Sequence, residues 1–439
     1  MGKYVATLNH LLFCCVFFAL LNFILLAALE GIKIKKAEFY GRQQFVINPL
    51  LNDNSPVISP STKLGDKDYL VQILRKAGVK ITTNVFKQLP TRTNFTAMYG
   101  SRPIIIGTET CSKFRDSTDP QYAFIGPAGC YNTGTNLLYK LLHQYCKMPQ
   151  RKPPPSTTLD DLATNQNMTK RVRNLLKESL TTGILDDVPW DKHAPANWRS
   201  TYRPFFRNVT DIRYENVLPV VTIKDPYFWM DSMCRHPYDA TWRRGAGGKC
   251  FSFTTELRRM NGLRGRSIDQ ERSAIPGRTK KRNRGRLKDG NHLYIGYHLR
   301  NPDLKRGVWY DNIIGLWNSF YMDYMNLSSP HLLIRYEDLL LHTETVMTEV
   351  CNCAGGEVIN NENGIHLEEE PAKDPKLHGM SSGLVSAILK YGNPTHRTKL
   401  FTENSLHYMK DHLNSETMKA FSYSYPPDDD RNRFHYNGA

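Results

Sequence analysis

A glycine-rich turn is the first feature of this sequence that could do chemistry. It lies in Phe124-Ile-Gly-Pro-Ala-Gly-Cys-Tyr-Asn-Thr-Gly-Thr-Asn-Leu-Leu138, where an apolar run predicts a strand and the leucines from Asn136 to Tyr145 predict a helix. A strand that enters such a turn and opens a helix aims backbone N–H groups and the positive end of the helix dipole at an anion. The pattern therefore predicts a phosphate-binding loop.

This turn lacks two residues that nucleoside triphosphatases need. Their motif G-x-x-x-x-G-K-[ST] can be counted from Gly129 to Gly134, but Thr135 stands at the lysine position and Asn136 at the magnesium-ligand position. The loop suits phosphate without the charge and metal ligand of ATP chemistry, so we expect no metal here. Cys351-Asn-Cys353 alone is too little for a zinc site.

The segment Asn132-Thr-Gly-Thr-Asn-Leu-Leu138 resembles the 5′-phosphosulfate loop of the sulfotransferase family. Its members transfer a sulfuryl group from 3′-phosphoadenosine 5′-phosphosulfate without a metal. The resemblance implies that this loop binds the 5′ end of that donor. The loop residues implied are Tyr131, Asn132, Thr133, Gly134, Thr135 and Asn136. The chain departs from the family at Asn132, where many members have a lysine that steadies the bridging oxygen.

A second segment resembles the site that binds the donor's 3′-phosphate. Family members place a basic residue at a strand end and a serine eight positions later, and Lys224 and Ser232 have that spacing. The residues from Val217 to Ile223 predict the strand, and those from Tyr227 to Cys234 the helix. Lysine keeps the charge of the family's usual arginine but loses its planar fork.

A third segment, Leu332-Leu-Ile-Arg-Tyr-Glu-Asp-Leu-Leu340, is similar to a strand-and-helix motif of the family. It predicts a strand over His331–Arg335 and a helix over Leu339–Cys351, which Asp338 would cap. The three matches occur in family order over roughly residues 120 to 425, apart from a basic insert.

Sulfuryl transfer to a hydroxyl needs a base, and histidine suits this task because its ordinary pKa lies near neutrality. His193 lies between the two donor segments, where soluble sulfotransferases have K-x-H-x-P, and the resemblance implies that it is the base. An ordinary loop histidine is the alternative, and His236 is a second candidate base. Lys192 could supply the cation that is missing at Asn132.

The elements around these residues alternate between strands and helices. Besides those above, the residues Tyr69–Ala77, Met168–Leu180 and Tyr310–Met325 predict helices, and Pro103–Gly107 predicts a strand. This order predicts an α/β fold with a P-loop-like parallel sheet that helices cover on both faces. We expect residues 66–425 to form one sulfotransferase-like domain, preceded by a linker at 30–65 and followed by a polar tail at 426–439.

The segment at residues 11–29 is apolar except for Asn22 and is long enough to cross a membrane. We expect a transmembrane signal-anchor after a short tail at 1–10, with a cleaved signal peptide as the alternative. Lys33, Lys35 and Lys36 would keep the C-terminal side of this segment in the cytosol, but N-x-[ST] sequons favour the lumen. The sequons begin at Asn94, Asn167, Asn208 and Asn326. We favour a Golgi protein with a lumenal catalytic domain.

The formal charge of +16 is concentrated in one segment. Twelve Lys or Arg residues lie between Leu257 and Lys288 against Asp269 and Glu271, within a predicted mobile insert at 243–290. The insert could remain a solvated loop or could contact a polyanionic acceptor or an anionic membrane. We expect no nucleic acid, because no nucleic-acid-binding motif accompanies the charge. In an oxidising lumen, Cys234 and Cys250 would form a disulfide across the start of the insert.

The sequence thus predicts a membrane-anchored sulfotransferase whose acceptor is a hydroxyl, on a glycan in the first place, with protein tyrosine and lipid headgroups still open. Two other classes remain. Asn132 fits a non-catalytic nucleotide- or carbohydrate-binding relative, and the glycine-rich turn leaves a P-loop kinase-like phosphotransferase as the third class.

Overall fold

The computed structural model describes residues 55–58, 65–152, 160, 170–201, 212–241, 293–298, 305–359, 362, 364–369 and 383–426. All of them belong to one unit, Asp53–Ala439. The predicted anchor at 11–29 and the basic insert at 243–290 lie outside these ranges and stay predictions. Within the ranges, every helix is too short or too polar to span a bilayer.

The fold is α/β and is built around a sheet of four strands in the order β1, β8, β4, β2. Their bounds are Ile105–Ile106, Leu332–Arg335, Val217–Ile223 and Phe124–Gly129. Strands β2, β4 and β8 run parallel, whereas the short edge strand β1 pairs with β8 antiparallel. Every residue of β2, β4 and β8 is buried. This burial explains why these strands are almost entirely apolar, as is typical of parallel strands, with Thr222 and Arg335 as the polar exceptions.

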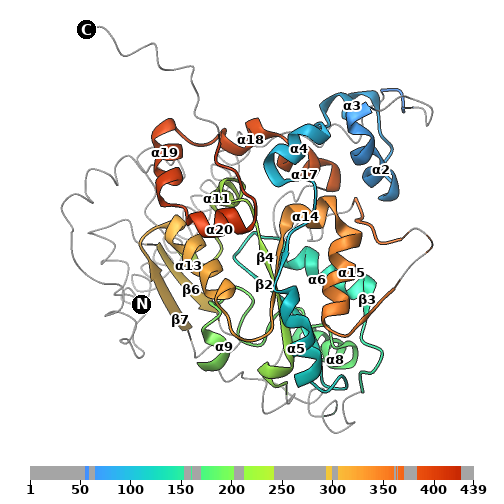
Figure 1. The fold of residues 1–439 in the computed structure, drawn as a ribbon, viewed down its shortest axis with the longest axis vertical. Coiled ribbons are helices and arrows are strands. Elements are labelled where there is room, and N and C mark those ends of the chain that lie inside the picture. The colour runs from blue at the N-terminus through green and yellow to red at the C-terminus, as the bar shows by residue number, and fades with distance from the viewer. Residues whose placement is uncertain are drawn as a thin grey trace, which may run out of the picture. The chain divides into compact units, whose positions relative to one another are not determined.

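Helices flank this sheet (Figure 1). Helix α6 (Thr135–Tyr145) contacts β2 and β4, and α15 (Thr343–Cys353) packs on α6. Figure 1 places α6 and α15 to one side of β2 and β4, and α13 (Ile313–Met325) to the other. Helix α11 (Pro226–Arg235) follows β4 directly. The predicted strand over Val217–Ile223 is confirmed. The predicted helices that correspond to α6, α11 and α13 are also confirmed, with ends shifted by a few residues.

One predicted helix is wrong in its extent. The chain over Leu339–Cys351 is divided between α14 (Tyr336–Leu341) and α15, with His342 between them. Because α14 begins at Tyr336, Asp338 lies inside its first turn and does not cap it. Its carboxylate instead accepts two hydrogen bonds from Arg335, at 2.6 and 2.7 Å. The pair is fully buried, so Asp338 stabilises the end of β8.

The remaining elements surround this core. The helices are α2 (Asp68–Lys76), α3 (Thr83–Gln88), α4 (Arg92–Tyr99), α5 (Cys111–Ser117), α8 (Lys170–Thr182), α9 (Trp198–Thr201), α17 (Leu384–Tyr391), α18 (Pro394–Thr398), α19 (Glu403–His412) and α20 (Ser415–Ala420). Short 3-10 turns span Gly65–Lys67, Thr108–Thr110 and Tyr214–Asn216. Two small antiparallel sheets pair β3 (Cys146–Lys147) with β9 (Glu357–Val358), and β5 (Ala240–Thr241) with β6 (Leu293–His298) and β7 (Lys305–Tyr310).

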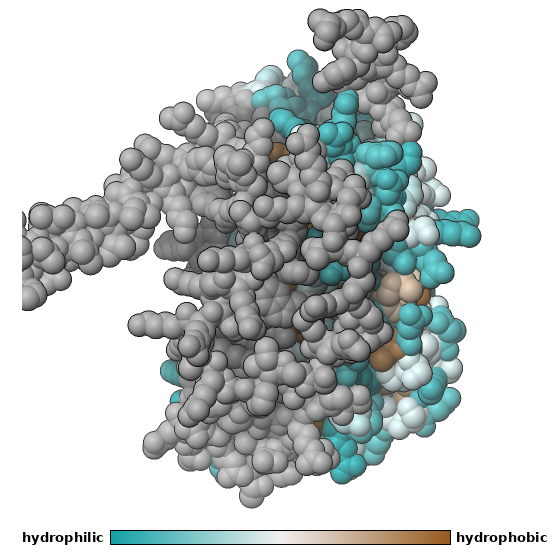
Figure 2. Space-filling view, turned by 90° about the vertical axis from the view of Figure 1, so that its left-hand side faces the viewer, coloured by the Kyte–Doolittle hydropathy of each residue, from teal (hydrophilic) through white to brown (hydrophobic). Residues whose placement is uncertain are grey.

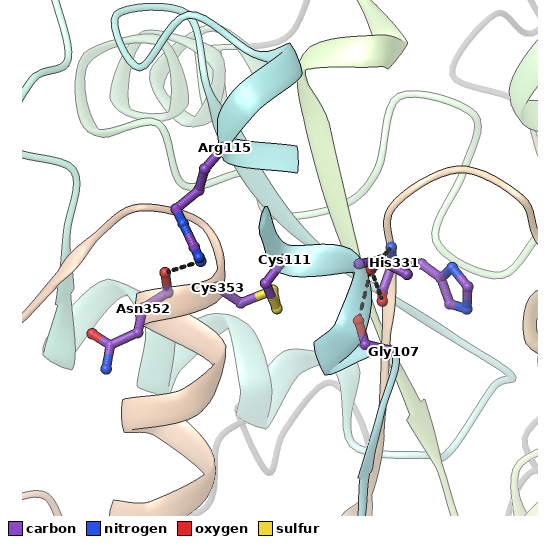
Figure 3. Close-up of a disulfide and its surroundings, with 7 residues drawn as sticks. Gly107, Cys111, Arg115, His331, Asn352 and Cys353 are labelled. Carbon is purple, nitrogen blue, oxygen red and sulfur yellow. Dashed lines mark hydrogen bonds between the residues drawn. A yellow bond between two sulfur atoms is a disulfide. The ribbon is translucent and has the colours of Figure 1, made fainter. Parts of the chain in front are cut away.

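Two disulfides join distant parts of the sequence at the end of α15. Cys111 of α5 pairs with Cys353, which brings α5 beside α15 (Figure 3), and Cys146 of β3 pairs with Cys351. Cys351 and Cys353 are therefore both used in disulfides.

The remaining cysteines of the described chain are Cys130 and Cys234. Cys130 is buried and is the free cysteine there. Cys234 is disulfide-bonded. Because its predicted partner Cys250 lies outside the described residues, that pairing stays a prediction.

Figure 2 shows one face, on which the described residues are mostly hydrophilic with a few separate hydrophobic areas. The large apolar or aromatic side chains that stand exposed among the described residues are Val57, Tyr122, Tyr238, Ile359 and Leu400. Tyr238 is of interest because it lies close to the glycine-rich loop in the fold.

Candidate functional site

The carboxyl ends of three parallel strands meet at one edge of the sheet. Gly129 of β2 is paired with Thr222, and Ile223 of β4 is paired with Arg335. The residues that follow these ends are the glycine-rich loop, Lys224 and the start of α14. In open α/β sheets this edge is where ligands bind. The fold therefore brings two of the sequence-predicted donor segments to one place.

Gly129 ends β2 in a backbone conformation that requires glycine. Its φ is +149°, and a Cβ atom there would lie 2.6 Å from Oγ1 of Thr222 and 2.7 Å from Oγ1 of Thr133. Those two hydroxyls are 2.9 Å apart, and Thr133 also donates to the carbonyl of Cys130 at 2.7 Å. The side chain of Thr133 is fully buried, so its hydroxyl fastens the loop to β4.

The loop opens helix α6 through two residues in the left-handed region. Asn132 has a φ of +65°, and Gly134, the N-cap of α6, has a φ of +93°. A Cβ at Gly134 would overlap the ring of Tyr336, which comes from the start of α14. The first N–H groups of a helix, here from Thr135 on, have no partner within the helix. They can donate to an anion in front of the loop.

The side chain of His193 is hydrogen-bonded to the backbone of the last residue of β2. Its Nδ1 lies 2.7 Å from the carbonyl oxygen of Gly129, and the N–H of Gly129 donates to the carbonyl of Lys192 at 2.7 Å. The N–H of His193 donates to Oδ1 of Asp191 at 2.9 Å, and Asp191 itself has a φ of +82°. When Nδ1 carries the proton and donates to Gly129, Nε2 carries the lone pair that a base needs.

Two contacts join this segment to the loop. The Nζ of Lys192 donates to Oδ1 of Asn136 at 3.2 Å, which places the ammonium at the first turn of α6. The ring of His193 packs against Tyr131 with 4.1 Å between the ring centroids. The structure thus brings together four predicted site residues from two segments of the sequence. They are Tyr131, Asn136, Lys192 and His193.

Lys224 is a buried cation that touches the loop. Its side chain is 3% exposed, and its Nζ donates to the carbonyl of Asn132 at 3.4 Å and to the hydroxyl of Tyr391 at 2.6 Å. The rings of Tyr336 and Tyr391 lie 4.3 and 4.2 Å from the ammonium. Burial lowers the pKa of Lys224 to about 7. An incoming phosphate would therefore meet a poorly solvated cation.

Ser232 lies on α11, and its hydroxyl donates to the carbonyl of Phe228 within that helix at 2.9 Å. Its link to the loop is indirect. The side-chain amide of Asn132 donates to the carbonyl of His236 at 2.8 Å, and the N–H of His236 donates to the carbonyl of Ser232 at 2.9 Å. Asn132 thus fixes the loop to the end of the helix that carries Ser232. His236, the alternative base, has an exposed side chain at this helix end.

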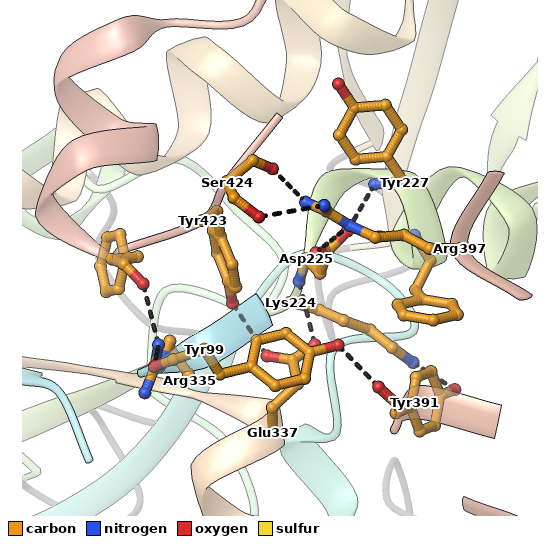
Figure 4. Close-up of polar contacts among 12 residues, drawn as sticks. Tyr99, Lys224, Asp225, Tyr227, Arg335, Glu337, Tyr391, Arg397, Tyr423 and Ser424 are labelled. Carbon is orange, nitrogen blue, oxygen red and sulfur yellow. Dashed lines mark hydrogen bonds and ion pairs between the residues drawn. The ribbon is translucent and has the colours of Figure 1, made fainter. Parts of the chain in front are cut away.

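A buried polar cluster lies next to Lys224 (Figure 4). Asp225 caps α11 and pairs with Arg397 at 2.7 Å, while Glu337 accepts from the N–H of Asp225 at 3.1 Å and from the hydroxyl of Tyr423 at 2.9 Å. Burial, followed by the charge of Asp225, raises the pKa of Glu337 to about 7. Sequence reasoning missed this cluster.

Local sequence could have suggested only part of the cluster. Asp225 precedes Pro226 at the start of a helix, which is a capping pattern. Arg397 and Tyr391 lie far along the chain and carry no such signal. Tyr336 was part of the third family-like segment, and the structure shows its ring between Gly134 and Lys224.

Within the described residues, no group of three or more His, Cys, Asp or Glu side chains is arranged to hold a metal ion. No protein-family model, curated protein or solved structure matches the chain.

Proposed function

We propose that this protein is a sulfotransferase that moves a sulfuryl group from 3′-phosphoadenosine 5′-phosphosulfate to a hydroxyl. The observation that carries the proposal is the contact between Lys224 and the carbonyl of Asn132, which joins the two segments expected to bind the two phosphate ends of the donor. A mononucleotide with phosphates at both ends needs two anion sites, and this contact brings two candidates together.

The loop would bind the 5′-phosphosulfate in a P-loop-like manner. The backbone of Tyr131–Asn136 and the N-terminus of α6 provide N–H donors, and the ammonium of Lys192 lies at the first turn of that helix. In this proposal, the ammonium would stabilise the charge that the leaving phosphate gains. It could replace the lysine that the family has at the position of Asn132. Lys224 and the helix of Ser232 would bind the 3′-phosphate.

His193 would act as the base. Nε2 would take the proton of the acceptor hydroxyl as its oxygen attacks sulfur in line, while the bond between sulfur and the phosphate oxygen breaks. The products are a sulfate ester and adenosine 3′,5′-bisphosphate. The Nδ1 contact with Gly129 holds the imidazole at the end of the loop and fixes its tautomer. Loop N–H groups and Lys192 would stabilise charge on the leaving group.

A secretory location agrees with the disulfides, because such bonds persist in oxidising compartments. We therefore retain the proposal of a Golgi protein anchored through residues 11–29, with a lumenal catalytic domain and a glycan hydroxyl as acceptor. No metal is required by this chemistry.

The test is to titrate the full chain with adenosine 3′,5′-bisphosphate in EDTA and, separately, with ATP and magnesium. We expect micromolar binding of the bisphosphate and none of ATP; the reverse would favour a phosphotransferase. The second measurement is transfer of labelled sulfate from the donor to a panel of glycans, proteins and lipids. Tight bisphosphate binding without transfer to any of them would identify a non-catalytic binding protein.

A further inference from the structure

One of the sequons lies on the loop that joins α13 to β8. It consists of Asn326, Leu327 and Ser328, and both Asn326 and Ser328 are exposed. Asn326 is the C-cap of α13, where its backbone N–H donates to the carbonyl of Met322 at 3.0 Å. Within the described chain, its side-chain amide makes no hydrogen bond. The amide nitrogen of Asn326 is therefore accessible from the solvent.

A buried arginine holds this loop in place. Arg199 is 6% exposed, and its Nη1 donates to Oγ of Ser329 at 2.6 Å and to the carbonyl of Pro330 at 3.3 Å. Its Nη2 donates to the carbonyls of Tyr214 at 3.0 Å and Val217 at 3.1 Å. Because Val217 is the first residue of β4, these bonds fix the loop to the start of that strand.

The loop lies at the edge of the sheet opposite the candidate site. It precedes Leu332, the first residue of β8, and β8 runs parallel to β4. Lys224 and the glycine-rich loop instead follow the carboxyl ends of β4 and β2. The seven residues of β4 separate the two edges by about 20 Å. A group attached to Asn326 would therefore leave the candidate site open.

The other described sequon has a different setting. Asn94 is part-buried in the first turn of α4, and its N–H donates to Oγ1 of Thr91, the N-cap, at 3.2 Å. The middle residue of this sequon, Phe95, is buried. Sequons that carry a glycan are typical of surface loops, because the glycan is bulky and hydrated. Asn326 meets this condition better than Asn94 does. The sequons at Asn167 and Asn208 lie outside the described residues.

We propose that Asn326 is an N-glycosylation site whose glycan projects from the amino-terminal edge of the sheet. In the transfer, the amide nitrogen of Asn326 bonds to C1 of the first sugar of a polyisoprenyl-diphosphate oligosaccharide. The bond from C1 to the diphosphate oxygen breaks, and the amide nitrogen loses one proton. Ser328 supplies the hydroxyl of the acceptor motif. The inference rests on the proposed secretory location, because the transfer takes place on the lumenal side.

The test expresses the full chain in cultured animal cells and treats it with peptide N-glycosidase in heavy-oxygen water. The enzyme hydrolyses each glycosylated asparagine to an aspartate that carries the heavy isotope, which mass spectrometry locates after reduction and trypsin digestion. Asn326 is the only sequon asparagine in the tryptic peptide 307–335, and Asn94 in 93–113. We expect the label at Asn326, with a higher occupancy than at Asn94. A sample without the enzyme controls for spontaneous deamidation.

Two serines of the loop provide matched variants. Ser328→Ala keeps Asn326 but breaks the acceptor motif, so it should remove the label, whereas Ser328→Thr should retain it. The control is Ser329→Ala, which removes the neighbouring hydroxyl but leaves the motif intact and should keep the label. Removal of the glycan from the wild type should change the affinity for adenosine 3′,5′-bisphosphate by less than about twofold.

Four results would overturn the inference: no label at Asn326, a label that persists in Ser328→Ala, occupancy at Asn94 equal to or above that at Asn326, or a changed bisphosphate affinity after glycan removal. A label at Asn167 or Asn208 but not at Asn326 would retain the secretory location and overturn the inference. Absence of the label from all four sequons would overturn both. A label at Asn326 in a protein that does not bind the bisphosphate would retain the inference and overturn the proposed sulfotransferase function.

Discussion

The imidazole Nδ1 of His193 lies 2.7 Å from the backbone carbonyl oxygen of Gly129. Gly129 is also the residue at which β2 becomes the glycine-rich loop, so His193 and this loop are positioned by the same residue. Asn132, Lys224 and Asp225 connect the loop to α11 and to the C-terminal helices. Substitutions can test each of these connections separately.

His193→Asn separates the structural role of the ring from its chemical role. The asparagine amide can place an N–H near the position of Nδ1 and keep the bond to Gly129, but it has no equivalent of Nε2. We expect the rate of sulfate transfer to fall about 10²- to 10⁴-fold, with bisphosphate affinity unchanged. A labelled-sulfate assay and calorimetric titration measure the two quantities. Transfer at the wild-type rate would exclude His193 as the base.

If the proposed function is right, Lys224 should make the affinity for the bisphosphate depend on pH. Its pKa is lowered to about 7 by burial, and a phosphate dianion favours the ammonium and raises that pKa again. Above pH 7, binding of the bisphosphate therefore adds a proton to Lys224. The affinity for the bisphosphate should fall by up to about tenfold for each unit by which the pH rises above 7. Lys224 should be protonated below that pH, where its contribution levels off.

The matched variant is Lys224→Arg. A guanidinium stays charged over the whole range, so its bisphosphate affinity should be nearly flat between pH 7 and 9. Glu337, Asp225, Asp231 and Arg235 all act on Lys224 and are present in both proteins. If the bisphosphate affinity changed equally with pH in the wild type and in Lys224→Arg, a group other than Lys224 would take up the proton on binding.

Asn132 has a backbone role and a side-chain role that two substitutions can separate. Asn132→Gly accepts a φ of +65° without strain, whereas Asn132→Ala does not. We therefore expect the free energy of unfolding of the alanine variant to be about 1 kcal/mol lower than that of the glycine variant. Both variants lose the bond to His236, which should weaken bisphosphate binding about fivefold. Urea denaturation and calorimetry measure these effects. Equal stability of the two variants would contradict the left-handed conformation.

The buried pair of Asp225 and Arg397 should be costly to break. Arg397→Ala leaves the carboxylate of Asp225 without its cation, and we expect a loss of about 3 to 5 kcal/mol in the free energy of unfolding. Adding Asp225→Asn should recover part of this loss, because the uncharged amide can still cap α11. Lys76→Ala, in the exposed pair with Glu344, is the control and should cost under about 0.5 kcal/mol. A small effect of Arg397→Ala would contradict the pairing.

Some parts of the fold could be predicted because their signal is local. The residues Val217–Ile223 form a continuous apolar run, since both faces of β4 are covered, and the parallel partners of this strand place Lys224 beside the loop. The break at His342 could not be predicted. Leu339–Cys351 has helical spacing throughout, and the helix start at Tyr336 is fixed by the contact of Asp338 with Arg335.

Other parts of the site depend on contacts between distant segments. Arg397 reaches Asp225 over 172 residues, and Tyr391 reaches Lys224 over 167. The stack of Tyr238 on Tyr131 depends on a turn with positive φ at a residue that does not suggest one. No periodicity or spacing encodes such contacts, because they form only after the sheet has assembled.

The two disulfides determine what happens when the chain is cut. Cys111 and Cys146 lie before the basic segment, and Cys351 and Cys353 lie after it, so the loops closed by these two disulfides both contain residues 257–288. A trypsin-like protease that cleaves at one of the twelve Lys or Arg residues there would leave two fragments that stay covalently joined. They would migrate as one species until a reductant separates them. Proteolytic processing at this segment would therefore not release the half of the protein that carries the loop.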